Sequence, residues 1–451
     1  MMSTSDSVSP PPTVAALGDR LYRLVEALVP LRRCLTGDGL RKTLARLAEE
    51  APVAITEVAT GTPVLDWTIP PEWHVREAYL ATPDGRRIVD WADSALHVVQ
   101  YSQSVHGRMT LAALRPHLHT LPERPDWVPY RTSYYTPAWG FCLAHRTLDA
   151  LAAEVGDDTP LEVVIDADHR DGSLTYGEIV VPGETEDEIL LSAHACHPHL
   201  ANDNAASLAV AAALASDRAT GLPRRYTLRV LVAPGTLGAI AWLHQNRATL
   251  ARIRHGLVLA NLGDGGSLTY KQTRRATLDG APHAVDRAVA LAARDLGVPL
   301  DVRSFSPTGY DERQFASPGI DLPVGRLTRT PHGEYPEYHT SADDLTLVRP
   351  DALAASYGAL AATLDILDGD ARYRSRVPDG EPQLGRRGLY APVGGQPVAP
   401  DAQTALLWVL NLADGSHSLL DAAVHSGLPF RTLRAAADRA LAAGLLDPAD
   451  A

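Results

Sequence analysis

The sequence predicts an α/β protein: a mixed, mainly parallel sheet sandwiched by helices, with a small β-rich insertion and a C-terminal winged-helix domain. Three observations lead to this prediction. Short apolar runs alternate with helical patterns between residues 188 and 297, short strand patterns separated by turn dipeptides occupy residues 69–130, and residues 401–451 contain three helical patterns. Strands that alternate with helices are typical of parallel sheets covered on both faces.

The N-terminal part begins with residues 1–12, whose Ser and Pro content predicts a disordered tail. Residues 17–31 repeat apolar side chains at helical spacing, and residues 55–67 have the composition of a strand. We therefore assign residues 13–68 to the α/β domain.

The segment 69–130 is predicted to be the small β-rich insertion. Strand patterns at 77–91 and 96–102 surround turn signals such as Asp84-Gly85. After it, residues 161–183 alternate on both sides of Asp171-Gly172-Ser173, which predicts a hairpin.

Residues 131–370 are predicted to complete the α/β domain. Buried-strand patterns at 188–195, 226–234 and 255–264 alternate with helical patterns at 205–217, 239–253 and 284–297. In such sheets, ligand sites form beyond the carboxyl ends of the strands.

The C-terminal part consists of a Pro-, Gly- and Arg-rich stretch at 371–400, interpreted as a linker, and three helical patterns at 401–451 broken at Asp414-Gly415 and Gly427-Leu428-Pro429. That rhythm is typical of helix-turn-helix and winged-helix modules. The third helix carries Arg431, Arg434 and Arg439 among many alanines. We favour a domain that packs on the catalytic part or mediates oligomers over one that binds DNA.

Composition narrows the class of protein. The formal net charge is −13, so nucleic-acid binding is not expected. We find no apolar run long enough for a membrane span and no signal-peptide pattern, and the three cysteines are far apart in the sequence, so we expect a cytoplasmic protein without disulfides. We expect it to form a homo-oligomer and to act on a small-molecule or peptide-like substrate.

A metal site is predicted at residues 192–204, SAHACHPHLANDN, which hold three histidines, a cysteine and an aspartate. His194 ends a buried strand, and Asp203 precedes a helix, where its simplest role would be an N-cap. His197 and His199 could be loop histidines. Taken together, at the carboxyl end of a strand, these residues favour a metal ion.

A second group of titratable residues lies in a loop-rich stretch at 309–344. Its prolines, glycines and tyrosines indicate an ordered segment rather than a mobile surface loop. Its carboxylate and imidazole residues are Asp311, Glu312, Asp321, His332, Glu334, Glu337, His339 and Asp343.

The order of these motifs resembles the co-catalytic zinc aminopeptidase superfamily, the M28-like peptidases. His194-Ala-Cys196, Asn202-Asp203-Asn204, Gly263-Asp264 and Tyr338-His339-Thr340 follow one another as that family's ligand motifs do. The motifs at 129–135, 139–142, 309–315, 322–344 and 380–390 resemble a bacterial subfamily that has an inserted β domain and a C-terminal winged helix. Proteins of that subfamily tend to accompany polysaccharide or natural-product biosynthesis genes.

The resemblance implies a set of metal ligands, namely His194, Asp203, Asp264 and His339, with His197 as a competing ligand. It also implies that Tyr338 donates to an oxyanion. Two positions depart from the family. Cys196 replaces an aspartate that orients a ligand, and Pro234-Gly235-Thr236 replaces a Glu-Glu pair that supplies the general base and a zinc ligand.

The predicted function is therefore zinc-dependent hydrolysis of an amide or peptide-like bond, with one ion favoured and two possible. Glu312 is the first choice for the general base, with Asp311, Glu334 and Glu337 as further candidates. Substrate-binding candidates are Arg326, Arg329, His332 and Glu334. The alternatives are a degenerate peptidase that binds a metabolite and regulates, a closed structural zinc site that includes Cys196, and an amide-forming or transfer enzyme.

Overall fold

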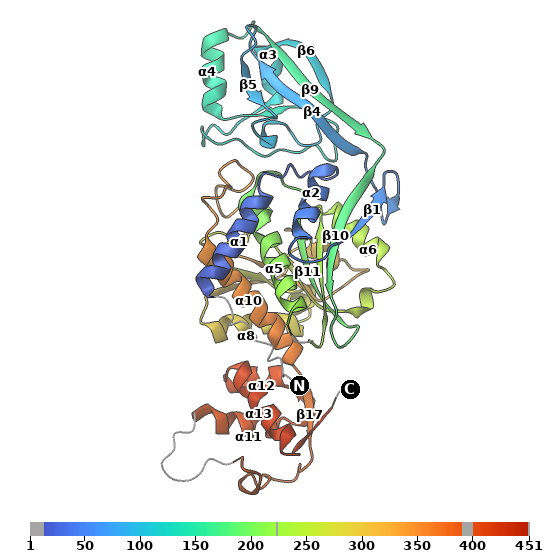
Figure 1. Cartoon of the computed structure of the whole chain (residues 1–451), viewed down its shortest axis with the longest axis vertical. Helices are drawn as coiled ribbons and strands as arrows, with labels where there is room; N and C mark the ends of the chain where they lie inside the picture. Colours follow the sequence, from blue (N-terminus) through green and yellow to red (C-terminus); the bar gives the residue numbers. More distant parts are fainter. Residues whose placement is uncertain (1–12, 222–223, 390–399, 450–451) are drawn as a thin grey trace, which may run out of the picture.

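The computed structural model describes residues 13–221, 224–389 and 400–449. The disordered tail predicted for residues 1–12 lies outside this part. Three bodies follow one another along the long axis of the molecule, as Figure 1 shows: the β-rich insertion, the α/β domain and the C-terminal module. No helix of the described chain is both long and apolar enough to cross a membrane.

The α/β domain is built on an eight-stranded sheet with the order β1-β10-β12-β11-β13-β16-β14-β15. The central strands β12, β11, β13 and β16 are parallel, while β1, β10 and β14 pair antiparallel with a neighbour. The strands are β1 (Ala54–Ala59), β10 (Ser173–Val181), β11 (Glu188–His194), β12 (Thr227–Ala233), β13 (Ile253–Leu259), β14 (Leu268–Lys271), β15 (Leu300–Arg303) and β16 (Val324–Thr328). The sheet is therefore mixed and mainly parallel, as predicted.

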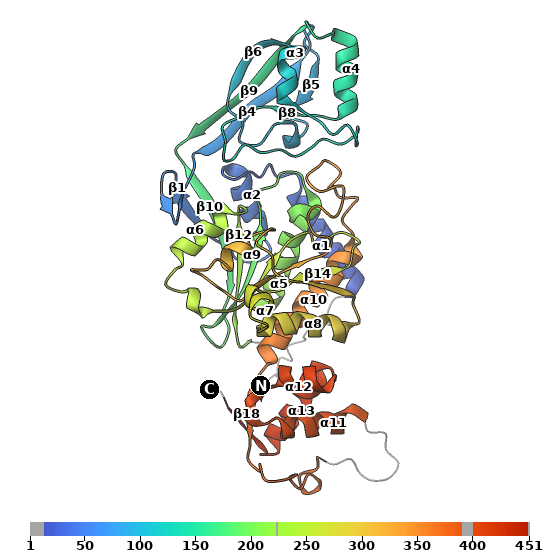
Figure 2. The same ribbon diagram turned by 180° about the vertical axis from the view of Figure 1, so that it is seen from behind.

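Helices cover both faces of this sheet because successive side chains of a buried strand point to opposite sides. Ile189 and Leu191 of β11 belong to one apolar core, and Leu190 belongs to the other. The first face carries α1 (Val14–Leu28), α2 (Asp38–Leu47), α5 (Ser207–Ala219), α8 (Ala284–Leu296) and α10 (Pro350–Gly369). The second carries α6 (Leu237–Gln245) and α9 (Glu312–Phe315), which are labelled in Figure 2. The short helix α7 (Arg274–Leu278) follows β14.

The insertion has its own four-stranded sheet with the order β5-β4-β9-β6. Its strands are β4 (Glu72–Ala81), β5 (Arg87–Asp90), β6 (Val105–Thr110) and β9 (Pro160–Arg170), accompanied by α3 (Leu111–Leu114) and α4 (His145–Val155). One short pair, β7 (Leu118–His119) with β8 (Phe141–Cys142), completes this region. The hairpin of β2 (Pro63–Val64) and β3 (Trp67–Thr68) precedes the insertion in the chain and packs against α6 of the α/β domain. The Asp84-Gly85 turn joins β4 to β5 as predicted.

The structure differs from the sequence prediction at one domain boundary and in one strand pairing. Because β9 pairs with β4 and β6, the small sheet continues past residue 130, to Arg170. The hairpin predicted at 161–183 is wrong: β9 and β10 are both strands, but β10 pairs with β1 and β12 in the other sheet. Alternation predicts a strand, but the partner of a strand depends on distant residues.

The C-terminal module is a three-helix winged-helix arrangement. It consists of β17 (Arg372–Ser375), α11 (Pro400–Asn411), β18 (Asp414–Ser418), α12 (Leu419–Ser426), α13 (Phe430–Ala442) and β19 (Leu446–Pro448), with the sheet order β18-β17-β19. The linker predicted at 371–400 thus contains β17, a strand of the module's sheet, while residues 390–399 lie outside the described chain.

Candidate functional site

The candidate site lies where the central strands of the main sheet end. His194 is the last residue of β11, and Gly235, Thr236 and Asn261 follow β12 and β13. Four non-glycine residues with positive φ lie in these loops: His199, Thr236, Asn261 and His339. Such conformations are rare for side-chain-bearing residues and concentrate at functional sites.

A cleft of about 200 Å³ opens at this edge. Histidines and tyrosines dominate its walls, with one carboxylate from Asp311 and small residues between them. The lining residues are Tyr130, Thr132, Tyr134, Tyr135, His194, Cys196, His197, Gly235, Thr236, Gly309, Tyr310, Asp311, His332, Tyr338 and His339.

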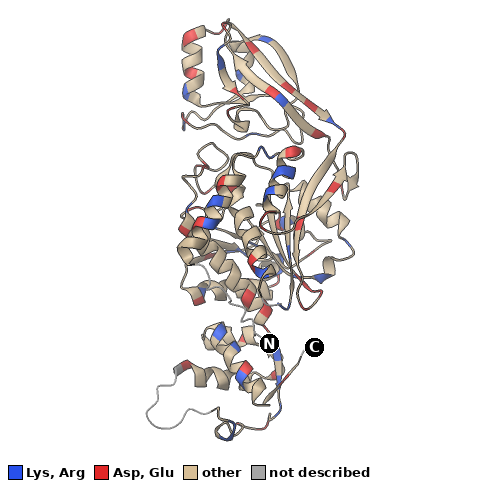
Figure 3. Ribbon diagram, viewed as in Figure 1, with Lys and Arg blue, Asp and Glu red and all other residues tan. Residues whose placement is uncertain are grey.

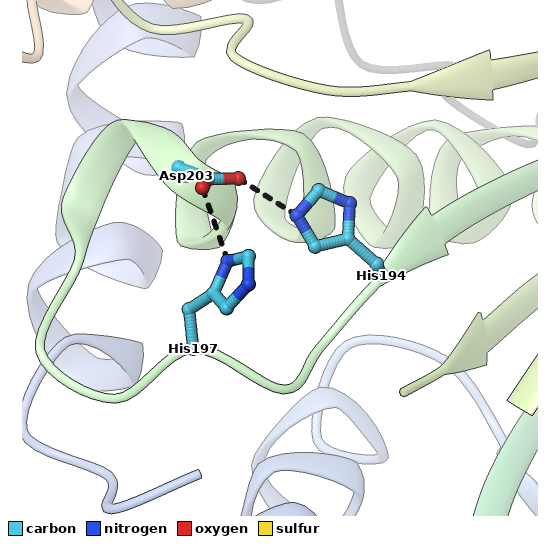
Figure 4. A group of neighbouring side chains, drawn as sticks. All are labelled: His194, His197 and Asp203. Carbon is cyan, nitrogen blue, oxygen red and sulfur yellow. Dashed lines mark hydrogen bonds and ion pairs between the residues drawn. The ribbon is translucent and has the colours of Figure 1, made fainter. Parts of the chain in front are cut away.

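One buried carboxylate meets three imidazoles beside this cleft. His194 Nε2 lies 2.7 Å from Asp203 Oδ1, and His197 Nδ1 lies 3.1 Å from Asp203 Oδ2, as Figure 4 shows. His339 Nε2 approaches the same Oδ2 at 3.1 Å. Asp203 is 0% exposed, so its charge is compensated by these rings rather than by water.

Three of these atoms make no hydrogen bond, although they are buried. Asp203 Oδ2, His197 Nδ1 and His339 Nε2 lack a hydrogen-bond partner in the described chain, despite their close approach. Buried polar atoms are almost always paired. His194, His197 and Asp203 each offer a ligand atom within 4.8 Å of the others. Nitrogen and carboxylate oxygen donors in this number fit a zinc ion.

The electrostatics of the cluster favour a charged carboxylate. Burial opposes ionisation of Asp203, but the neighbouring His197 and His194 hold the pKa of its carboxyl well below the usual value. Burial also disfavours a protonated His197, whereas the Asp203 charge raises the pKa of this imidazole well above its ordinary value. The site therefore combines an ionised carboxylate with imidazoles whose protons a metal ion would displace.

Asp343 holds the backbone that carries Asp203. Its Oδ1 accepts a hydrogen bond from Asn202 N (2.6 Å), and its Oδ2 accepts one from Asp203 N (3.0 Å). The Asn204 amide donates to Leu259 O at 3.1 Å and accepts from Asn261 N at 3.2 Å. The segment η3 (Ala201–Ala206), whose backbone is not helical at Asp203 and Asn204 and which leads into α5, is thus fixed to the strand ends.

Asp264, predicted as a metal ligand, is not brought to this cluster. Its Oδ1 accepts from Gly266 N (2.7 Å) and Thr330 Oγ1 (2.6 Å), and its Oδ2 accepts from Asn202 Nδ2 at 3.0 Å. Both oxygens are therefore occupied by hydrogen bonds that connect three loops. Asp264 therefore contacts the cluster indirectly, because it binds the side chain of Asn202, the residue before Asp203.

The two positions that depart from the aminopeptidase pattern lie side by side. Gly235 N donates to Cys196 Sγ at 3.3 Å, so the thiol is engaged with the backbone. Thr236, with φ of 63°, donates its N–H to Asp311 Oδ1 at 2.7 Å. Asp311 thus lies next to the place where the family has a Glu-Glu pair.

Glu312, the first candidate for the general base, is turned away from the cleft. It is 0% exposed and its Oε1 lies 2.7 Å from Lys271 Nζ and 3.4 Å from Arg326 Nη1. This ion-pair group lies behind Tyr310, whose ring is 5.6 Å from the Arg326 guanidinium carbon. Lys271 thus engages Oε1, while Oε2 has no hydrogen-bond partner in the described chain, and Glu312 is not among the residues that line the cleft.

Most of the predicted substrate-binding residues are also outside the cleft lining. Arg329 donates to Ala352 O and Ser356 Oγ, and Glu334 pairs with Arg303 on the surface. Glu337 does not line the cleft. His332 does line it, and its ring packs edge to face with that of Tyr310, with centroids 5.1 Å apart.

Tyr338 also lines the cleft and stacks on His339, with ring centroids 3.9 Å apart. Burial raises the pKa of its phenol, so the hydroxyl stays protonated and can donate a hydrogen bond.

Several residues of the site were not predicted. Tyr130, Tyr134 and Tyr310 form much of the wall, and Arg33, 1% exposed, donates from Nε to the His197 carbonyl oxygen at 2.8 Å. Tyr130 N donates to His339 O at 2.7 Å and so braces the opposite loop. The tyrosine-rich run at 130–135 was a usable signal, whereas nothing local distinguishes Arg33.

Comparisons with known proteins agree with this architecture. Residues 22–370 match the family described as "Domain of unknown function (DUF4910)", and residues 371–448 match a winged helix-turn-helix family. A Clostridium acetobutylicum protein named "Putative polysaccharide biosynthesis protein with aminopeptidase-like domain" is 42% identical over 421 residues, which are 93% of this chain and 94% of that protein.

Solved structures show the same relationship. A "putative peptidase" from Clostridium acetobutylicum superimposes with a TM-score of 0.89 at 40% identity, over 96% of this chain and 97% of that one. BSAP, a zinc aminopeptidase from Bacillus subtilis, shares the fold with a TM-score of 0.55 at 15% identity, over 79% and 96% of the two chains. The chain therefore belongs to the DUF4910 family, built on the fold of the zinc aminopeptidases and followed by a winged helix-turn-helix module.

Proposed function

We propose that this protein is a zinc-dependent hydrolase of amide or peptide-like bonds in a small substrate. The observation that carries the proposal is a set of three buried atoms beside an accessible cleft: His197 Nδ1 and His339 Nε2 each lie 3.1 Å from Asp203 Oδ2, yet none of the three has a hydrogen-bond partner in the described chain. His194 is the fourth candidate ligand, through its contact with Asp203 Oδ1.

The number of ions follows from the donors available. One ion suits this set, because Asp264 and Cys196 are engaged elsewhere and Gly235-Thr236 offer no carboxylate. A second ion would need Asp203 to bridge. Zinc supplies Lewis acidity, which polarises a carbonyl group and makes water easier to deprotonate.

Asp311 is the residue that we assign as general base. It is the carboxylate of the cleft lining, it makes no ion pair within the described chain, and a backbone N–H holds it in place. Burial raises the pKa of its carboxyl, so it is a stronger base than an ordinary aspartate. Tyr338 is positioned to donate a hydrogen bond to the oxyanion that forms when water adds to the carbonyl carbon.

Metal analysis and turnover of purified variants test this proposal. The wild-type chain should hold about one zinc per chain, Asp203→Asn should hold far less, and Asp149→Asn, at an exposed position of α4, should match the wild type. Asp311→Asn should keep its zinc and lose turnover by about 100-fold or more. Full zinc content in Asp203→Asn would reject the metal site.

One further candidate function has a specific observation in its favour. The position of the usual Glu-Glu pair is Gly235-Thr236, which suits a protein that binds a metabolite without hydrolysing it. Identification of reaction products by NMR separates the possibilities. Hydrolysis yields a carboxylate and an amine, transfer yields a new amide, and a binding protein leaves the ligand unchanged.

A further inference from the structure

We propose that the cleft selects N-acylated, uncharged amides over peptides with a free N-terminal ammonium, and that an aromatic rim receives the amine part of the substrate. This inference deepens the proposed hydrolase function and rests on it. It assigns a substrate class: an acyl group without an ammonium, joined through its amide to a ring or an apolar group.

The first argument is the charge of the cleft wall. Apart from the histidines, the tyrosines and Cys196, Asp311 is the one ionisable side chain among the residues that the structure places along the cleft. An ammonium that is removed from water needs an anionic partner, because an unpaired buried charge is strongly disfavoured. If Asp311 accepts the proton of water, no carboxylate of the lining remains for an ammonium.

The second argument is that nearby carboxylates are already engaged. Glu334 pairs with Arg303, and Glu312 with Lys271. Asp343 accepts two backbone N–H groups and is 0% exposed. Apart from Asp311, no acid of the stretch 309–344 lines the cleft.

The third argument is the aromatic rim. Tyr135 lines the cleft and is 58% exposed, and its ring centroid is 5.4 Å from that of Trp67, which is 39% exposed. Trp67 belongs to the β2–β3 hairpin, which carries the half-exposed Leu65 and is held at the Leu65 N–H by His244 Nδ1 at 3.4 Å. Exposed aromatic faces gathered at a cleft bind flat or apolar groups such as sugar rings and aryl groups.

The reaction that this arrangement serves is deacylation. Water adds to the acyl carbonyl carbon and gives up a proton to Asp311. The carbon–nitrogen bond then breaks as Asp311 returns that proton to the amine nitrogen, and the acyl part leaves as a carboxylate after its remaining hydroxyl proton passes to solvent. No oxidant or second substrate is needed, since water supplies all the atoms that are added.

A matched pair of anilides tests the inference on the full-length, zinc-loaded chain. 4-Nitroacetanilide and glycine 4-nitroanilide release the same nitroaniline and differ by the ammonium group on the carbon next to the carbonyl. We expect kcat/KM for the acetyl compound to be at least about tenfold higher. Equal or faster cleavage of the glycyl compound would overturn the inference while leaving the hydrolase function intact.

If neither compound is cleaved, the proposed hydrolysis is contradicted, and calorimetric titration of the two compounds then decides the inference. Tighter binding of the acetyl compound supports it. Tighter or equal binding of the glycyl compound, or no binding of either, overturns it.

Two variants sharpen the test. Thr132→Asp places a carboxylate on the exposed part of the cleft wall, and it should raise kcat/KM for the glycyl compound relative to the acetyl compound. Trp67→Ala should raise KM for both anilides several-fold and leave kcat and zinc content unchanged. Leu278→Ala, at an exposed apolar position of α7 away from the cleft lining, is the control. An unchanged KM in Trp67→Ala would remove the aromatic rim from the proposal.

Discussion

Glu312 shows at the scale of a single residue why position in the sequence does not determine chemical role. It follows Asp311 directly, yet Asp311 faces the cleft and Glu312 points into a fully buried contact with Lys271 and Arg326. Lys271, one of two lysines in the chain, also donates to Thr308 O at 2.6 Å. This group stabilises the loop at 308–312 that presents Asp311.

The role of that ion pair can be measured. Glu312→Gln should reduce the free energy of unfolding by about 3–5 kcal/mol, because it leaves the Lys271 ammonium buried without a counter-charge. Lys271→Met should have a comparable effect. The double variant should be more stable than the sum of the two changes predicts, as denaturant titration would show. Strict additivity would mean that the two side chains do not interact.

His255, near the amino end of β13, makes stability depend on pH. Burial lowers the pKa of its imidazole to about 3, whereas the unfolded chain has an ordinary histidine with a pKa of about 6.5. The native state therefore stays unprotonated while the unfolded state binds a proton, so this contribution to stability is present above pH 6.5 and is lost as pH falls toward 3.

The expected result is a smaller acid effect in His255→Gln. Between pH 7 and pH 5 the wild type should lose up to about 2 kcal/mol more unfolding free energy than the variant. His425→Gln, at an exposed position, is the control and should follow the wild type. Equal pH dependence of wild type and His255→Gln, measured by urea unfolding, would contradict the assignment.

At the scale of elements, local patterns predict strands and helices well and partners poorly. The apolar runs of buried-strand type that predicted β11, β12 and β13 coincide with these strands, because continuous apolar runs between helical patterns are typical of buried parallel strands. The strands β9 and β10 also exist, but they belong to different sheets. Pairing is decided by β1, β4 and β12, which are far away in the chain.

Dependence on residues distant in the chain also explains which site residues the sequence predicted correctly. The motif at 192–204 and His339 were recognisable because the residue types themselves are ligands. Asp264 and Glu312 are equally suitable as residue types, and only the structure shows that Thr330 and Lys271 occupy them. The sequence alone does not show which side chains are already bound by residues far away in the chain.

The start of α13 depends on a residue from another domain. Its N-cap, Pro429, makes no side-chain hydrogen bond, and the Phe430 N–H instead donates to Asp295 Oδ2 at 2.8 Å. Asp295→Ala should therefore destabilise the C-terminal module by about 1 kcal/mol, as the loss of a helix cap does. Hydrogen exchange localised to α13 is the measurement, and Asp301→Ala, on the exposed β15, is the control. Unchanged exchange in α13 would show that the contact does not contribute.

At the scale of the whole molecule, the winged-helix module is docked through the end that DNA-binding modules use. In helix-turn-helix proteins, the N-terminal residues of the recognition helix contact the bases. Here that end, at Phe430, faces Asp295 of α8, and Arg434 donates to Gly369 O at 2.9 Å. Further contacts join Arg294 to Leu428 O at 2.7 Å and Arg287 to Asp421.

The charge of the module agrees with a docking role. Figure 3 shows acidic and basic residues interspersed along its helices. Arg434 also lies 3.0 Å from Asp438, which neutralises part of the recognition helix. Protein–DNA affinity depends on clustered cations that replace counterions along the phosphates, and the chain as a whole is acidic.

We therefore predict that the full-length chain does not bind duplex DNA at about 150 mM salt, with any Kd in fluorescence anisotropy weaker than about 10⁻⁶ M. The double variant Asp295→Ala with Arg287→Ala removes a cap and an ion pair of the docked face, and it should loosen the module without creating DNA binding, because the helix lacks a basic face. Tight binding by the wild type would contradict the docking role. Binding gained in the double variant alone would show instead that docking conceals a DNA-binding surface.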